Sequence, residues 1–230
     1  MGCSKYKFIE AYFNGWGDKL ERAKFLTDSK KFHLEGLTVL LCHISALARG
    51  RYPELYDRDS FKKVVKKYSG KYDLFENIDL LFLFQYQDSK VSDCSIYKKL
   101  THYDEIILAV ERAIGTEEDI HGSCCLRYQK REKLLEILKN ADISGFNCDN
   151  FEKYIELFSN NQILYDFARC EAVHNQHFPL INIGFSPLDK QESYTSNHQI
   201  DSKVLTETLY GLVENLKIEC LEKELWPCEL

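Results

Sequence analysis

The stretch "HLEGLTVLLCHISALARGRYP", residues 33–53, determines the fold class of this 230-residue chain. Its apolar residues recur at spacings of three and four, the period of an α-helix: Leu37, Leu40, Leu41, Ile44 and Ala48. Other apolar residues lie outside that stripe, so we expect neighbouring helices to surround this one. Gly50 suits the left-handed position at a helix end, and Pro53 cannot continue a helix. The stretch therefore predicts a central helix that ends near residue 50.

Helical periodicity continues on both sides of this segment. Towards the N-terminus, "KYKFIEAYF" and "DKLERAKFL" flank Gly15 and Gly17 and predict two helical pieces, or one helix with a break. Towards the C-terminus, helical patterns cover residues 102–115, 126–141, 149–158 and about 201–221, and "FPLINIGFSP" is the one β-like stretch. The sequence predicts an all-α antiparallel bundle of about six to nine helices with short irregular insertions, in a single domain spanning 1–230.

Composition limits the classes of function. The net charge is −6, whereas a chain that binds nucleic acid over its whole surface is normally basic, so any such binding needs a local basic patch or cleft. The nine cysteines are odd in number and form no Cys-x-x-Cys pair, which indicates reduced thiols and a cytoplasmic location. No apolar run is as long as a membrane span, so we expect no membrane partner.

Reactive side chains gather in "YDFARCEAVHNQHFPL", residues 165–180. On a regular α-helix, one face would carry Ile163, Phe167, Cys170 and His174. Arg169 precedes His174 by five residues, which places the two side chains about 140° apart. They can still reach one cleft if the helix ends near His174, and Pro179 indicates an end nearby.

An arginine and a histidine at this spacing suit cleavage of RNA without a metal or cofactor. The arginine fork matches a phosphate, and the histidine exchanges protons near neutral pH. The 2′-hydroxyl of RNA is itself the nucleophile, so the protein has to hold the phosphate, move a proton and stabilise charge. Arg169 and His174 are therefore the candidate catalytic pair, and RNA is the candidate substrate.

The segment "RCEAVH", Arg169 to His174, resembles the Arg-x(4–6)-His motif of the HEPN superfamily, and the central helix resembles the early helix of plasmid-encoded HEPN proteins. The resemblance implies a helical bundle that forms a homodimer through the motif face. It implies that Arg169 holds the scissile phosphate and that His174 is the general acid or base. Members are commonly ribonucleases of toxin–antitoxin, CRISPR-associated or phage-defence systems, which implies an antitoxin or a nucleotidyltransferase-like partner.

One position departs from the family pattern. Members often carry Asn, Asp or His directly after the arginine, where this chain has Cys170, and a thiol is a poorer hydrogen-bonding group. The alternative is therefore a non-catalytic HEPN-like module that binds a nucleotide or RNA, or that neutralises a partner toxin. A helical scaffold in which the motif is coincidental is a further alternative.

Other chemistries remain open for these residues. Cys170, His174 and His177 could bind a metal, although no fourth ligand is apparent nearby. Cys170 and His174 could form a nucleophilic pair, although no recognisable nucleophile turn surrounds the cysteine. His174 could equally be a core histidine, and Arg169 could pair with Asp166 on its own helix.

A cluster of lysines forms the second candidate surface. Lys62, Lys63, Lys66 and Lys67 fill the positions between the apolar residues of one predicted helix, and Lys71 follows. Such a cluster is typical of a solvated helix face. The alternative is a track for RNA phosphates, with His177 as a further RNA-binding residue.

Overall fold

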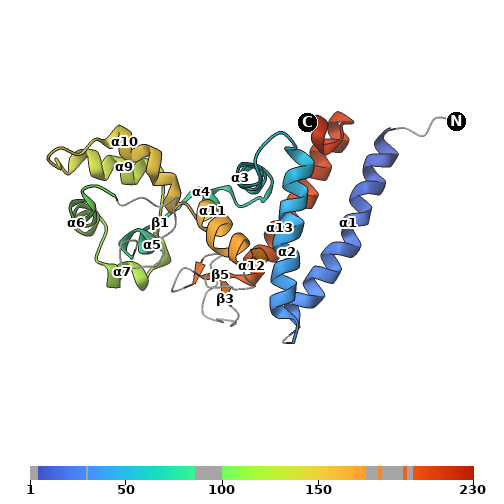
Figure 1. The fold of residues 1–230 in the computed structure, drawn as a ribbon, viewed down its shortest axis with the longest axis horizontal. Helices are drawn as coiled ribbons and strands as arrows, with labels where there is room; N and C mark the ends of the chain where they lie inside the picture. The colour runs from blue at the N-terminus through green and yellow to red at the C-terminus, as the bar shows by residue number, and fades with distance from the viewer. Residues whose placement is uncertain (1–4, 30, 86–99, 175–180, 183–193, 196–198) are drawn as a thin grey trace. The chain divides into compact units, whose positions relative to one another are not determined.

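The computed structural model describes residues 5–29, 31–85, 100–174, 181–182, 194–195 and 199–230. The protein is mostly helical with a few short strands, which confirms the all-α class (Figure 1). Contacts group the chain into two compact units, one of residues 1–72 and 164–230 and the other of residues 73–163. Each unit is described by itself. The single domain over residues 1–230 stays a prediction.

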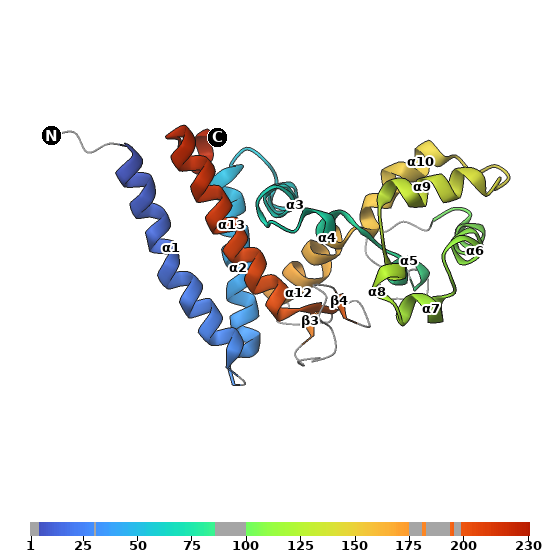
Figure 2. The same cartoon turned by 180° about the vertical axis from the view of Figure 1, so that it is seen from behind.

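The first unit is built around the helix that the opening stretch predicts. This helix, α2, contacts four others, α1, α3, α12 and α13. Figures 1 and 2 show α1, α2 and α13 side by side. The bounds of the five helices are α1 (Lys5–Asp28), α2 (His33–Arg51), α3 (Asp57–Tyr68), α12 (Cys170–His174) and α13 (Ser202–Lys223).

The apolar stripes of α2 and α13 form the core of this unit. The predicted α2 stripe is buried throughout, with 1% or less of each side chain exposed. The α13 stripe, Val204, Leu205, Thr208, Leu209, Leu212, Val213 and Leu216, is buried as well. Burial of two helical stripes against each other provides the main driving force for this packing. Helical periodicity therefore located both helices correctly.

The predicted end of α2 near residue 50 is confirmed, but the predicted break at Gly15 and Gly17 and the left-handed position at Gly50 are wrong. The helix α1 runs without a break through Gly15 and Gly17. A glycine costs about 1 kcal/mol inside a helix, and the buried side chains of Phe13 and Trp16 on the same helix outweigh that cost. The helix α2 continues through Gly50 to Arg51, because the next backbone N–H still bonds to the Ala48 carbonyl.

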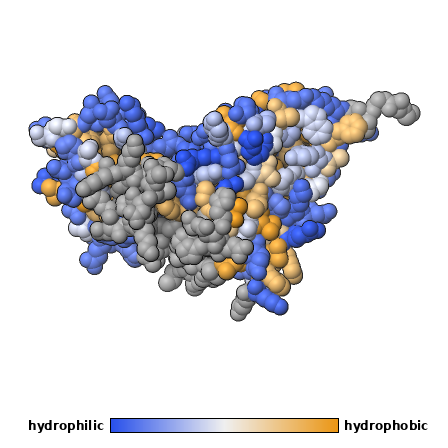
Figure 3. Space-filling view, in the orientation of Figure 1, coloured by the Kyte–Doolittle hydropathy of each residue, from blue (hydrophilic) through white to orange (hydrophobic). Residues whose placement is uncertain are grey.

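Apolar residues also reach the surface where α1 leads into α2. Figure 3 shows them gathered there, among the polar residues of this face. Phe25 is 70% exposed, and Phe32 and Leu34 are exposed by 39% and 41%. Among the described helices, none has the length and apolar character that crossing a membrane requires.

The chain returns to the first unit through a π-helical segment, Leu164–Arg169, which continues directly into α12. Hydrogen bonds from residue i to i+5 change the angular spacing of the side chains. Tyr165 and Ala168 are buried in this segment, whereas Phe167 and Cys170 are only half-buried. The segment is therefore not the regular α-helix on which one face was expected to carry Ile163, Phe167, Cys170 and His174.

A small sheet precedes α13. Strand β5 (Gln199–Asp201) pairs in parallel with β3 (Ile181–Asn182) and antiparallel with β4 (Tyr194–Thr195). Strand β3 lies within the predicted β-like stretch and confirms it.

The second unit consists of short helices around one antiparallel strand pair. Strand β1 (Ile78–Asp79) pairs with β2 (Tyr128–Gln129). The helices are α4 (Tyr72–Glu76), α5 (Leu80–Phe84), α6 (Tyr103–Ala113), α7 (Glu117–His121), α8 (Cys124–Arg127), α9 (Arg131–Asn140), α10 (Cys148–Ile155) and α11 (Asn160–Ile163). All five residues of α5 are buried, so this apolar segment is core.

A buried ion pair joins β1 to α8 in the second unit. Nε of Arg127 donates to Oδ1 of Asp79 at 2.9 Å, and Nη2 donates to Oδ2 at 2.7 Å. The side chains are only 3% and 1% exposed. Oδ1 of Asp79 also accepts the backbone N–H of Phe82 and thereby caps α5. The Asp79 carboxylate on β1 thus binds Arg127 on α8 and caps the first turn of α5.

Candidate functional site

The arginine of the motif is held inside the first unit. Arg169 is the last residue of the π-helical segment, and its side chain is 14% exposed. Its Nη2 atom lies 2.8 Å from Oδ2 of Asp57, the first residue of α3. Its Nε atom donates to Oγ of Ser45, on α2, at 3.2 Å. Groups from two helices therefore fix the orientation of the guanidinium.

Tyr165 completes the surroundings of Arg169. Its hydroxyl donates to the same Asp57 oxygen at 2.8 Å. Its ring centroid lies 5.4 Å from the guanidinium carbon of Arg169 and 5.7 Å from that of Arg58, both within the range of a cation–π contact. Burial, with the hydrogen bond to Asp57, raises the pKa of Tyr165, so the hydroxyl remains a neutral donor.

A second ion pair lies beside the first. Nη2 of Arg58 is 3.3 Å from Oδ1 of Asp166, whose side chain is 5% exposed. The neighbouring residues Asp57 and Arg58 of α3 thus pair with Arg169 and Asp166 of the π-helical segment. The salt bridge of Arg169 crosses to α3 and does not join the arginine to Asp166 on its own segment. Together the four residues form a charge-balanced cluster.

Cys170 directly follows this arginine and is half-buried. Burial raises the pKa of the Cys170 thiol, and the opposing effect of neighbouring Arg169 is smaller. The thiol is therefore uncharged at neutral pH. A neutral thiol is a weak hydrogen-bond donor and a poor nucleophile, so the geometry gives little support to covalent catalysis by Cys170.

The two histidines of the motif region are described only in part. The backbone of His174 ends α12, but its side chain and the whole of His177 lie outside the described residues. The structure thus places the Arg169 side chain and not the partner imidazole. Within the described part of the chain, no group of three or more His, Cys, Asp or Glu residues could hold a metal ion.

The predicted lysine cluster lies on α3 and makes contacts within the first unit. Lys67 lies 2.9 Å from a carboxylate oxygen of Glu219 on α13, and Lys71 lies 3.0 Å from Glu207. The ammonium of Lys63 lies 4.3 Å from the ring centroid of Tyr52, and that of Lys66 lies 5.3 Å from that of Tyr72. Lys62 is half-buried. These contacts favour a solvated helix face that helps to join α3 to α13.

Sequence patterns did not identify Asp57, Ser45 or Tyr165 as neighbours of Arg169. Tyr165 stands inside the reactive stretch and was visible as a polar aromatic residue close to the motif. Asp57 and Ser45 belong to distant helices, and no local pattern links them to Arg169. Their contribution arises from the packing of α2 and α3 against the π-helical segment.

Comparisons of this chain with protein-family models, with curated proteins and with solved structures found no match.

Proposed function

We propose that this protein is a HEPN-like ribonuclease that cleaves RNA without a metal, with Arg169 and His174 as its working pair. One observation carries the proposal: Asp57 and Ser45 hold the Arg169 guanidinium in a fixed orientation, five residues before His174. Catalysis of phosphodiester cleavage benefits from a donor that is already oriented before the substrate arrives. Helices packed around a central α2 agree with the helical bundle that the resemblance implies.

The remaining donors of Arg169 would contact the phosphate. Nη2 and Nε are engaged by Asp57 and Ser45, and Nη1 takes part in neither of these two contacts. In the proposed reaction, Arg169 binds a non-bridging phosphate oxygen and stabilises the charge that develops there. His174 removes the proton from the ribose 2′-hydroxyl, which then attacks the phosphorus atom and displaces the 5′-oxygen of the next nucleotide, and the proton held by His174 passes to that leaving oxygen.

The proposal includes a homodimer in the cytoplasm. The Arg169 and His174 pairs of both subunits would line one cleft, as the HEPN resemblance implies. A toxin or defence role would add an antitoxin or a nucleotidyltransferase-like partner. Sedimentation of the purified chain tests the dimer.

Cleavage of single-stranded RNA in the presence of a chelator tests the reaction. The parent chain is expected to cut the RNA, and His174→Ala is expected to lose that activity while keeping its helical circular dichroism. His121→Ala, at an exposed position at the end of α7, is the matched control and should cut as the parent does. Equal cleavage by His174→Ala and the parent would contradict the proposal.

A second candidate is a non-catalytic HEPN-like module that binds RNA or a nucleotide, or neutralises a toxin. The observation that favours it is the Asp57 carboxylate, which offsets the positive charge of Arg169, together with the neutral thiol at Cys170. Expression of the chain alone separates the candidates. Growth arrest that depends on Arg169 and His174 supports the ribonuclease, whereas normal growth with RNA bound but uncut supports the binding module.

A further inference from the structure

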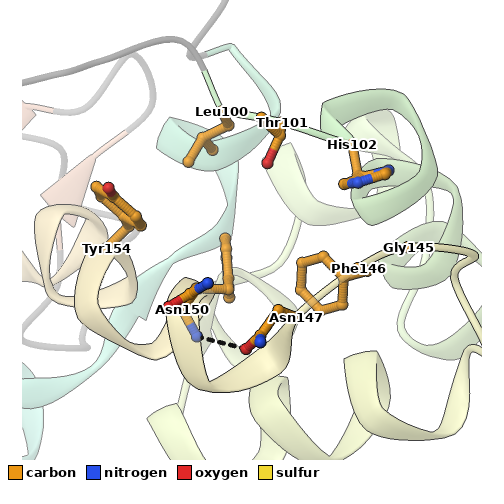
Figure 4. A pocket seen from close by; sticks show the side chains of 9 residues that line it. Leu100, Thr101, His102, Gly145, Phe146, Asn147, Asn150 and Tyr154 are labelled. Atoms are coloured by element: carbon orange, nitrogen blue, oxygen red, sulfur yellow. Dashed lines mark hydrogen bonds between the residues drawn. The ribbon is translucent and has the colours of Figure 1, made fainter.

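The second unit contains a cavity of about 250 Å³ between the start of α6 and the segment that leads into α10 (Figure 4). Its apolar lining includes Leu100 and Phe151, which are 8% and 4% exposed, and the ring of Phe146. Figure 4 shows Leu100 and Thr101 across the space from Asn147 and Asn150. The volume lies just below the range of about 300–1,000 Å³ that is usual for small-molecule sites, so the cavity suits a ligand no larger than one or two rings.

Polar groups line the rim of this cavity. Oδ1 of Asn147 accepts the backbone N–H of Asn150 at 2.9 Å and caps α10, so the cap leaves the amide NH₂ of Asn147 available (Figure 4). The NH₂ group of Asn150 and the hydroxyls of Thr101 and Tyr154 also have no hydrogen-bond partner within the described chain. Several donors and acceptors therefore surround an apolar space, which is the usual composition of a specific small-molecule site.

The lining contains no Lys, Arg, Asp or Glu. A phosphate or carboxylate inside this cavity would have no cationic side chain of the lining to offset its charge, apart from a protonated His102. The cavity therefore suits an uncharged ligand that combines an apolar surface with hydrogen-bonding edges.

The backbone around the cavity is strained at His102. This residue adopts φ 60° and ψ 31°, the left-handed region that side chains other than glycine seldom occupy. Gly145, with φ 73°, takes the same region on the other side, where a Cβ atom would lie 3.8 Å from Cε1 of His102. The imidazole meets Phe146 edge-on, with ring centroids 6.1 Å apart. Strained positions of this kind are concentrated at ligand-binding sites.

We propose that this cavity binds an adenine base. The Tyr154 ring is 40% exposed and has no ring partner among the described residues, so its face is available for stacking. The Asn150 carboxamide carries a donor and an acceptor side by side, the arrangement that matches N7 and the 6-amino group of adenine. Its Oδ1 atom accepts a long hydrogen bond of 3.4 Å from the Lys153 ammonium, which the 6-amino group would replace. The site needs neither Arg169 nor His174, so it does not depend on the proposed cleavage of RNA.

Calorimetric titration of the full chain with adenosine tests the site. We expect saturable binding of one adenosine per chain, weakened about tenfold or more by Tyr154→Ala because stacking is lost. Tyr56→Ala is the matched control, because Tyr56 is 85% exposed and lies outside the cavity, and it should bind as the parent does.

Asn150→Leu tests recognition of the base edge and keeps a similar side-chain volume. The parent should bind adenosine more tightly than purine riboside, which lacks the 6-amino group, and the variant should bind both equally. Adenosine monophosphate and a short single-stranded oligoadenylate then distinguish a free nucleotide from a base presented by RNA. Absence of saturable adenosine binding, equal binding of adenosine and purine riboside by the parent, or equal weakening by Tyr154→Ala and Tyr56→Ala would overturn the proposal.

Discussion

Nη2 of Arg169 lies 2.8 Å from Oδ2 of Asp57, and this contact joins the π-helical segment to the first turn of α3. The same carboxylate oxygen accepts the Tyr165 hydroxyl. The arginine of the motif therefore has a structural role whatever chemistry it performs. Substitutions of Arg169 alter folding and function together, so substitutions of its partners are the more informative tests.

Asp57→Asn should lower the free energy of unfolding by about 1–3 kcal/mol, because the largely buried guanidinium of Arg169 loses its charged partner. Urea denaturation measures this effect. Asp59→Asn is the control, since Asp59 also lies in the first turn of α3 but is exposed, and it should change stability much less. Equal losses of stability in the two variants would show that the ion pair of Asp57 with Arg169 adds nothing to the interaction of a first-turn carboxylate with the helix dipole.

The same variant tests whether Asp57 positions Arg169 for the proposed reaction. If it does, Asp57→Asn should cut RNA more slowly than Asp59→Asn under conditions where both variants are folded. Unchanged cleavage by folded Asp57→Asn would restrict Asp57 to a structural role.

Arg127→Met should destabilise the second unit by about 3–5 kcal/mol, because it leaves the Asp79 carboxylate buried without its charged partner. Adding Asp79→Asn should recover part of this loss, since it removes the uncompensated charge. Hydrogen exchange of the amides of α5 and α8 measures the effect within this unit.

The control for the buried pair is the exposed pair of Arg131 and Glu152, whose side chains are 39% and 49% exposed. Arg131→Met should lower the free energy of unfolding by no more than about 1 kcal/mol. A similar cost for Arg127→Met would mean that the buried pair does not stabilise the link between β1 and α8.

Stability should fall in acid because of Glu219. Burial by itself would raise the pKa of this carboxyl, but hydrogen bonds from Lys223, Tyr68 and Lys67 lower it from 4.5 to about 2. A carboxyl with a lowered pKa stabilises the folded state above pH 4.5, and this contribution is lost as the pH falls towards 2. The shift corresponds to about 3 kcal/mol at most.

Urea denaturation of Glu219→Gln between pH 6 and pH 2 tests this acid dependence. The variant should be less stable than the parent at pH 6, and the difference should shrink as the pH falls. Glu222→Gln, on the exposed side of the same helix, should follow the parent at every pH. A parent and a Glu219→Gln variant with parallel pH profiles would contradict the prediction.

Two glycine substitutions should have opposite effects. In Gly211→Ala the new Cβ would lie 2.3 Å from the backbone oxygen of Ser69, so α13 and the end of α3 would have to separate. This separation should lower the free energy of unfolding by about 1–3 kcal/mol. In Gly17→Ala the new Cβ meets nothing within 4 Å on α1, and the better helix former should add up to about 1 kcal/mol. Thermal unfolding compares both variants, and a stable Gly211→Ala would show that this close approach is not needed.

Periodicity predicted those parts of the fold that depend on local spacing. The apolar stripes of α2 and α13 were visible in the sequence because each turn of a helix repeats the same burial. Local signals were less reliable at helix boundaries, where packing on either side of Gly15 and Gly17 outweighed the weak preferences of single glycines.

The sequence by itself determined that the chain is helical, that α2 is central and that reactive side chains gather around Arg169. Only the tertiary structure decided which groups surround this arginine. In the π-helical segment the angular spacing of the side chains differs from that of an α-helix. The contacts of Arg169 come from Ser45 on α2 and Asp57 on α3, which lie in distant parts of the sequence. Such contacts depend on how helices pack in three dimensions, and no local pattern of residues records that packing.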